Sequence, residues 1–282
     1  MVNRRIFLKV AAAAGGTGLL GSLSNCASQK LTKRKRSIDF QTCMPWLFDG
    51  KPFGPEELTA LEDEAGIERF VVFPEAAPRP DNLGLAKRIY TKTRIIGCAS
   101  VNPTLGKETV RELEWSVKEL GFKGVRLSPV AHGYQIDDVI VYPLLEKARD
   151  LGVPVTVENG DAPNCRPSRI AAAAGRFPEV PIILDMSYRA PIYVYGPGRR
   201  SEMVEVMQKC PNLYLGLTSL TTCQPPYLLA SVSIGGAERV VFGSYAPSGI
   251  PLFAVKGIDL AGLGPKAEAL IFGENLIKVY KL

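Results

Sequence analysis

The sequence predicts an α/β protein, a single (β/α)₈ TIM barrel preceded by a signal segment. Short, β-branched apolar runs alternate with longer helical segments throughout residues 37–282. The runs show no polar–apolar alternation, as expected for parallel strands that are buried on both faces. The length suits one barrel, and no linker rich in Ser, Gly or Pro divides it. A doubly wound open sheet is the alternative, but no glycine-rich phosphate loop follows the first run.

The predicted strands come in chain order and are separated by helical segments. The strands are expected at residues 37–43, 69–73, 94–101, 124–127, 153–157, 181–185, 213–217 and 239–242. The helices are expected at residues 55–65, 82–91, 107–120, 138–151, 167–177, 200–209, 225–234 and 265–280. Asp138 is expected to cap the start of the fourth helix, and Gly152 to end it just before the next strand.

The N-terminus has the pattern of a twin-arginine export signal. Arg4 and Arg5 precede Phe7 and Leu8, and a weakly apolar run over residues 10–23 follows. That run is too short to span a membrane as a permanent helix and has the length of a signal h-region. The pattern predicts export, with the protein in the periplasm or anchored outside the cytoplasm. The alternative is a cytosolic protein with a basic N-terminus and an apolar first helix.

Residues 1–26 form the predicted signal, and their end resembles a lipobox. Leu23 lies three residues before Cys26, which would become the lipid-bearing first residue of the mature chain. Asn25 fits this pattern poorly, so ordinary cleavage is the alternative. Residues 27–36 are predicted to be a basic tether that lies beside an anionic membrane surface, or a disordered segment without a membrane role.

The charge distribution argues against nucleic-acid binding. The chain has a formal net charge of +6, but eight of its 34 Lys and Arg residues lie in residues 1–36, where there is no acidic residue. The remaining 26 basic and 28 acidic residues leave the barrel a net charge of −2. A protein that binds nucleic acid by charge would carry a basic patch on its folded part.

The cysteines argue against a disulfide framework. If Cys26 carries lipid, five cysteines remain, and none has CxxC spacing. An odd number without that spacing also argues against a structural zinc site.

Several motifs in order along the barrel resemble the amidohydrolase-related family of metal-dependent barrel hydrolases and decarboxylases. The strongest stretch is Gly-Phe-Lys-Gly-Val-Arg-Leu-Ser-Pro at residues 121–129. It is followed by Asp-Asp at 137–138, Tyr-Pro-Leu at 142–144, residues 151–160, Arg-Val-Val-Phe-Gly-Ser at 239–244 and Gly-Glu-Asn at 273–275. The resemblance implies a TIM barrel with its chemistry at the carboxyl ends of the strands.

The same resemblance implies a metal site, yet every position where the family has a ligand holds another residue. In place of the expected His, His, His, His and Asp, the chain has Gln41, Cys43, Glu158, Met186 and Tyr245. The chain has one His, whereas sites of this type need several converging imidazoles or carboxylates. The sequence-based expectation is therefore no metal and no cofactor.

The strand ends are polar nevertheless. Glu158 and Asp185 are the candidate catalytic residues, because burial can raise a carboxyl pKa toward neutrality and make the group a base toward water. The candidate substrate-binding residues are Arg126, Ser128, His132, Tyr188, Arg189 and Tyr245. An arginine among tyrosines suits a small anionic or aromatic acid, because its guanidinium can bind a carboxylate through two hydrogen bonds.

Three functions remain open from the sequence. The first is an exported hydrolase or decarboxylase-like enzyme that acts on a small carboxylated or cyclic substrate, without metal. The second is a non-catalytic barrel at the cell surface that binds a ligand or a partner. The third is a subunit or scaffold of a cell-surface assembly, in which the pocket has no function. The replaced ligand positions favour the second and third functions, and the charged groups at the strand ends favour the first.

Overall fold

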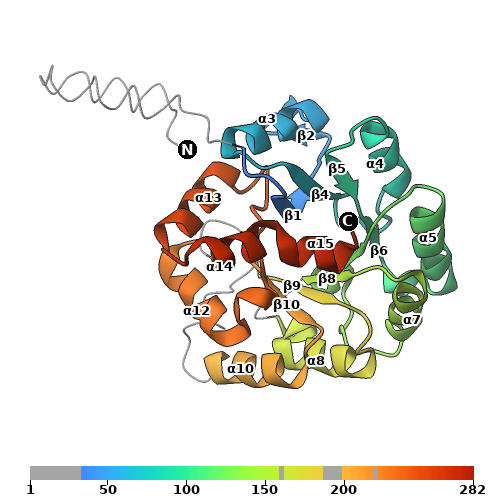
Figure 1. Cartoon of the computed structure of the whole chain (residues 1–282). Coiled ribbons are helices and arrows are strands. Elements are labelled where there is room, and N and C mark those ends of the chain that lie inside the picture. Colours follow the sequence, from blue (N-terminus) through green and yellow to red (C-terminus); the bar gives the residue numbers. More distant parts are fainter. Residues whose placement is uncertain (1–32, 159–161, 187–198, 219–221) are drawn as a thin grey trace, which may run out of the picture. The chain divides into compact units, whose positions relative to one another are not determined.

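The computed structural model describes residues 33–158, 162–186, 199–218 and 222–282. The signal segment, Cys26 and most of the predicted tether lie outside these residues. The strands stand at the centre and the helices surround them (Figure 1). The strands are β1 (Ile38–Cys43), β4 (Arg69–Phe73), β5 (Ile95–Gly97), β6 (Ala99–Val101), β7 (Val125–Leu127), β8 (Val155–Glu158), β9 (Ile182–Asp185), β10 (Leu213–Gly216) and β11 (Val240–Val241).

The strands form two parallel sheets, with the orders β1-β4-β5 and β6-β7-β8-β9-β10-β11. The predicted third strand is divided at Cys98 into β5 and β6, which belong to different sheets. The edges of the two sheets also meet near β11, because the Phe40 N–H donates to the Phe242 carbonyl at 3.0 Å. Thr42 and Ala246 form a parallel bridge nearby. These strands therefore do not form a single eight-stranded sheet.

Most predicted helices are present with shifted ends. The longer ones are α3 (Pro55–Ala65), α4 (Asn82–Ile89), α5 (Lys107–Lys118), α7 (Tyr142–Leu151), α8 (Pro167–Arg176), α10 (Arg199–Lys209), α12 (Pro225–Gly235), α13 (Pro251–Leu260) and α15 (Asn275–Tyr280). The short ones are α6 (Pro129–His132), α14 (Pro265–Ala269), the π-helical turn η4 (Leu270–Glu274) and the 3₁₀ turns η1 (Pro103–Leu105), η2 (Pro163–Cys165) and η3 (Ala237–Arg239). None of the described helices is long and apolar enough to cross a membrane.

Two helix predictions need correction. Helix α7 begins at Tyr142 instead of residue 138, because the Asp138 carboxylate accepts the Ile140 N–H at 3.2 Å and holds a separate turn. Its predicted end is confirmed, since Gly152 takes the left-handed conformation with φ 65°. The predicted helix 265–280 is interrupted by η4, where a Cβ on Gly273 would lie 1.8 Å from the Arg36 carbonyl.

Two elements were absent from the sequence-based prediction. Helix α13 follows β11, and its apolar residues do not give it one clear polar face, so periodicity does not reveal it. A small antiparallel hairpin, β2 (Leu47–Phe48) and β3 (Lys51–Pro52), follows β1. Two-residue strands are too short to give a period-two signal.

Part of the predicted basic tether belongs to the folded domain. The Arg34 N–H donates to the Gly66 carbonyl at 2.8 Å, its guanidinium pairs with Asp259, and it stacks 4.5 Å from the Phe272 ring centroid. Lys33, by contrast, is exposed. The packed domain therefore begins before residue 37, because the aromatic ring and the carboxylate that hold Arg34 come from the far end of the chain.

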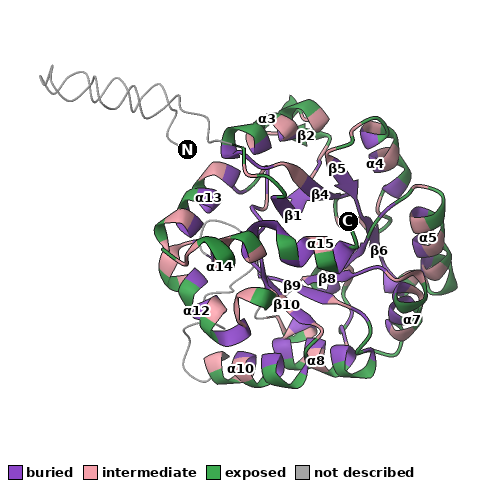
Figure 2. Cartoon of the chain, viewed as in Figure 1, coloured by how far each residue is buried: buried purple, intermediate pink, exposed green. Residues whose placement is uncertain are grey.

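The core lies inside the ring of strands. Leu276, Val279 and Tyr280 of α15 pack in one cluster with Ile38, the first residue of β1, and with Val71 of β4. Figure 2 shows the buried strands inside and the exposed outer faces of the helices. Helix α15 therefore packs against the interior of the barrel, and its apolar residues are part of the core.

Candidate functional site

A cavity of about 350 Å³ opens at the carboxyl ends of the strands. Three of its lining residues, Cys43, Glu158 and Asp185, are the last residues of β1, β8 and β9. Parallel strands bring their carboxyl ends to one edge, which explains why residues far apart in the sequence meet here. The other lining residues are Gln41, Pro45, Leu47, Phe48, Glu75, Ala76, Arg126, Ser128, Ala131, Tyr245, Ala246, Pro247 and Ser248.

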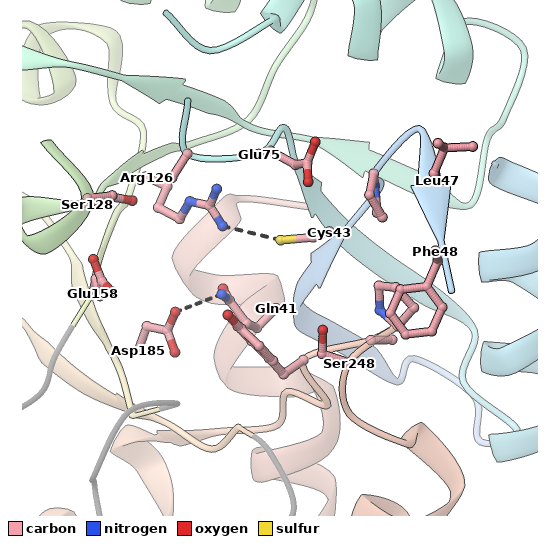
Figure 3. A pocket seen from close by; sticks show the side chains of 16 residues that line it. Gln41, Cys43, Leu47, Phe48, Glu75, Arg126, Ser128, Glu158, Asp185 and Ser248 are labelled. Atoms are coloured by element: carbon pink, nitrogen blue, oxygen red, sulfur yellow. Dashed lines mark hydrogen bonds between the residues drawn. The ribbon is translucent and has the colours of Figure 1, made fainter. Parts of the chain in front are cut away.

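Arg126 is the positive charge of the cavity. It is 6% exposed, and its side chain extends from β7 toward Cys43 on β1 (Figure 3). One guanidinium nitrogen, Nη1, donates to the Cys43 sulfur at 3.4 Å, and Nη2 donates to the Pro74 carbonyl at 2.5 Å. Its carbon Cζ lies 5.0 Å from the Phe73 ring centroid. Within the described residues Arg126 forms no salt bridge with a carboxylate, and its Nε has no hydrogen-bond partner.

Glu158 and Asp185 are paired in register on the adjacent strands β8 and β9. Asp185 is buried and its Oδ2 accepts from the Gln41 amide at 2.7 Å. The Thr218 hydroxyl donates to its other oxygen at 3.4 Å. Both oxygens of the Asp185 carboxyl group therefore accept hydrogen bonds. Burial, and then the charge of Asp185, raise the pKa of Glu158, which keeps a proton to higher pH than an ordinary carboxyl group. The two carboxyl groups therefore have environments that suit different roles.

Tyr245 forms one wall of the cavity. Its backbone has φ 64°, in the left-handed region, and its N–H donates to the Gln41 carbonyl at 2.9 Å. That bond holds a conformation that is unfavourable for a residue with a Cβ. Burial raises the pKa of the phenol, so its hydroxyl stays neutral and can donate a hydrogen bond.

The apolar wall was not predicted from the sequence. Leu47 and Phe48 of the β2–β3 hairpin line the cavity opposite Glu158 (Figure 3). The signal that could have revealed them is the Trp-Leu-Phe run at residues 46–48, an apolar triplet outside any predicted strand or helix. Together with Arg126, this wall makes the cavity suited to a ligand with one flat apolar part and one anionic group.

Some of the predicted site residues lie together in the structure, and others do not. Arg126, Ser128, Glu158, Asp185 and Tyr245 line one cavity. Tyr188 and Arg189 lie outside the described residues.

His132, predicted to contact substrate, is not among the residues that line the cavity. Its Nε2 lies 2.9 Å from the Ala77 carbonyl, and its ring stacks on Tyr134. Burial lowers the pKa of the imidazole, which favours its neutral form. These contacts give His132 a place in the packing of the loop.

A second carboxyl pair, also missed by the sequence analysis, lies next to the site. Asp39 accepts the Gln41 N–H at 2.9 Å and the Ser244 N–H at 3.0 Å, so it ties β1 to the segment after β11. Glu62 of α3 is fully buried and interacts with it. Two carboxylates cannot donate to each other, so a hydrogen bond between Asp39 and Glu62 requires a proton on one of them. Burial raises the pKa of Asp39 to about 7, and burial and Asp39 raise that of Glu62 well above its ordinary value.

Residues 37–282 match the family described as Amidohydrolase. The chain belongs to the amidohydrolase family. This confirms the resemblance carried by the motifs between residues 121 and 275. No curated protein matches the chain in sequence.

Solved structures share the fold of this amidohydrolase. A dihydroxybenzoic acid decarboxylase from Polaromonas sp. JS666, with bound manganese and the inhibitor 2-nitroresorcinol, has a TM-score of 0.67 and 18% identity over 89% of this chain and 98% of that chain. A 5-carboxyvanillate decarboxylase from Sphingomonas paucimobilis has a TM-score of 0.67 and 15% identity over 88% and 100%. A TIM-barrel protein from Bordetella bronchiseptica has a TM-score of 0.69 and 18% identity over 87% and 98%.

The manganese in the Polaromonas decarboxylase contradicts the sequence-based prediction that no cofactor is involved, and we withdraw that prediction. The prediction rested on the replaced histidines alone, which is too narrow a criterion because manganese also accepts carboxylate and carbonyl oxygens.

The described residues do not by themselves fit such an ion. In the described ranges, no three His, Cys, Asp or Glu residues are close enough together to hold a metal. The Arg126 guanidinium also lies against Cys43 and interacts with Asp185, so a positive charge already occupies the region between them. We therefore derive no chemical step through a metal.

Proposed function

We propose that this amidohydrolase is an enzyme that binds a small aromatic or cyclic carboxylic acid, or its ester, through Arg126 and hydrolyses or decarboxylates it. The proposal rests on the environment of the Arg126 guanidinium. A buried guanidinium without a carboxylate partner among the described residues faces an open cavity. Buried charges are normally paired, and a substrate carboxylate supplies the missing partner.

Size and chemistry support the same class of ligand. A volume of about 350 Å³ is at the small end of ligand sites and suits a single ring with its substituents. Leu47 and Phe48 provide an apolar wall, and Tyr245 provides a hydroxyl. The similar structures from Polaromonas and Sphingomonas are decarboxylases of dihydroxybenzoic acid and 5-carboxyvanillate, which are acids of this kind.

Glu158 and Asp185 provide the acid–base chemistry. Burial raises the pKa of Glu158, which suits this group to proton transfer, and Asp185 accepts hydrogen bonds from Gln41 and Thr218. In hydrolysis, Glu158 takes the proton of the attacking water, and in decarboxylation it returns a proton to the ring carbon. We also infer that the strands close into an eight-stranded barrel through the Phe40–Phe242 hydrogen bond.

Replacing Glu158 with Gln tests the catalytic role. We expect turnover of an aromatic ester or hydroxybenzoic acid to fall about 10²–10⁴-fold, because a positioned general acid or base contributes that much. Binding of the acid, measured by calorimetry, should remain. In the wild type, the rate of ester hydrolysis should rise with pH through a value above the ordinary carboxyl range, because the base must be ionised. The Glu158→Gln variant should lack that rise.

The matched control is Glu146→Gln, an exposed carboxyl on α7, which should retain wild-type turnover. Full activity in Glu158→Gln would contradict the catalytic assignment. Binding of acids without any turnover in the wild type would support the alternative, a barrel that binds a ligand and does not catalyse.

We propose in addition that the protein is exported by the twin-arginine route and anchored through Cys26. Changing Arg4 and Arg5 together to Lys should keep the protein in the cytoplasm, because the arginine pair is the recognised feature of the signal. Changing Cys26 to Ala should release the exported protein from the membrane fraction, since the lipid acceptor is lost. Cell fractionation with immunoblotting measures both outcomes. Wild-type export of the double Lys variant would contradict the route.

A further inference from the structure

Cys43 differs from the other cysteines of the described residues. It is half-buried and lines the cavity, whereas Cys98, Cys165, Cys210 and Cys223 are buried and outside the lining. Burial raises the pKa of Cys98 to about 12, so this thiol stays protonated and unreactive. Cys43 is therefore the one thiol of the described residues that a ligand in the cavity can touch.

The Cys43 sulfur lies beside a fixed positive charge. Arg126 Nη1 donates to it at 3.4 Å, and Figure 3 shows the guanidinium directed at the sulfur. The thiolate is the nucleophilic form of cysteine, and a guanidinium this close can stabilise the negative charge that returns to the sulfur when a carbon–sulfur bond breaks. The same guanidinium can stabilise negative charge on an oxygen that develops next to the sulfur.

Three further polar atoms at the cavity have no hydrogen-bond partner among the described residues. They are Oε1 of Gln41, whose residue is fully buried, Nε of Arg126 and Oε2 of Glu158. All three residues line the cavity. Buried polar atoms are almost always hydrogen-bonded, so an unpaired acceptor and an unpaired donor at one cavity indicate a polar ligand. A carbonyl group beside Cys43 can accept from Arg126, and a hydroxyl or water can donate to Gln41.

We propose that Cys43 is a catalytic nucleophile that forms a thioester with the carbonyl carbon of a bound ester or lactone of an aromatic acid. The inference deepens the proposed function and rests on it, because the acid part of the ester occupies the place assigned to the acid ligand. Arg126 binds the carbonyl oxygen, and the sulfur beside it attacks the carbon.

The reaction balances with water as the only co-reactant. The sulfur–carbon bond forms, the bond from the carbonyl carbon to the alcohol oxygen breaks, and the leaving alkoxide takes the proton of Glu158. Water then gives a proton to Glu158, its oxygen bonds to the carbonyl carbon, and the carbon–sulfur bond breaks. The products are the acid and the alcohol, and the thiolate and protonated Glu158 are regenerated.

The probe for this reaction is 4-nitrophenyl benzoate, whose acyl part is an aromatic acid and whose leaving group is coloured. The wild-type full chain should release 4-nitrophenolate in a stoichiometric burst. Mass spectrometry should then find a benzoyl group on the peptide that contains Cys43, and neutral hydroxylamine should remove it, as it removes thioesters. Arg126→Ala should slow the burst about 10²–10³-fold, the effect of losing a donor to the oxyanion.

Cys43→Ala should have no burst and no adduct, and the matched control Cys210→Ala should keep both. If Cys43→Ala fails to fold, the wild type still tests the proposal, because excess benzoate should slow the alkylation of Cys43 by iodoacetamide. A burst that persists in folded Cys43→Ala, or a benzoyl group found only on lysine, would overturn the proposal. If benzoate binds but no thioester forms, the nucleophile is wrong and the proposed function stands. If benzoate does not bind, both fail.

Discussion

Replacing Arg126 with Ala is expected to abolish the binding of aromatic acids while lowering the stability of the protein only modestly. The guanidinium forms no salt bridge with a carboxylate among the described residues, so its removal breaks no close ion pair. The free energy of unfolding should fall by about 1–3 kcal/mol, because the Pro74 carbonyl loses its donor and the contact with the Phe73 ring is lost. Breaking a closed buried ion pair would instead cost about 3–5 kcal/mol. Thermal-shift measurements with benzoic, hydroxybenzoic and dicarboxylic acids record both quantities.

Arg94→Ala is the matched control, because it should show the opposite behaviour. Arg94 pairs with Asp63 at 2.8 Å and donates to the carbonyls of Ile67 and Glu68, each also at 2.8 Å, far from the cavity lining. Its loss should lower the melting temperature and leave acid binding intact. If no acid stabilises the wild type and Arg126→Ala melts far below it, Arg126 is structural and the proposed ligand is wrong.

Replacing Glu62 with Gln is expected to remove part of the loss of stability that the wild type shows as pH rises. In the folded wild type, burial raises the pKa of Asp39 to about 7, and burial together with the charge of Asp39 raises that of Glu62 well above its ordinary value. The folded state therefore holds more protons than the unfolded chain above pH ~4, where unfolded carboxyl groups ionise. Stability must then fall as pH rises through that range. The Gln amide can donate to Asp39 without a titrating proton, so the variant should lack this loss.

Denaturant unfolding at pH 5 and pH 8 measures the effect. At pH 8 the Glu62→Gln variant should be more stable than the wild type by about 2–4 kcal/mol, since each pKa unit corresponds to about 1.4 kcal/mol. At pH 5 the difference should be small. Glu64→Gln, an exposed carboxyl on the same helix, should follow the wild type at both values. Equal stability of the two variants at pH 8 would show that Asp39 and Glu62 do not share a proton.

The sequence predicted the local elements well and their pairing less well. Strands 69–73 and 181–185 are present with ends that differ by at most one residue, because buried parallel strands are short runs of β-branched residues that the sequence shows directly. The third strand is divided at Cys98 because its two halves pair with different neighbours. No property of residues 94–101 taken alone encodes which strand lies on either side.

The same contrast holds for the site. The sequence indicated Arg126, Glu158 and Asp185, because polar residues at the ends of apolar strands stand out against their surroundings. It treated Cys43 only as a replaced ligand position, and it assigned no role to Asp39. Their roles depend on neighbours that come from residues 62, 126 and 244, which are distant in the chain.

The sequence by itself determined the family, the alternation of strands and helices, and the end of the strands at which polar groups gather. These properties follow from composition and short-range pattern, which each segment carries alone. Only the tertiary structure decided that Arg126 lies beside a thiol instead of a carboxylate, and that Leu47 and Phe48 wall the cavity. It also decided that Glu62 meets Asp39 in the interior. The physical reason is that charge and reactivity depend on burial and on through-space neighbours within a few ångströms, and chain order does not specify those distances.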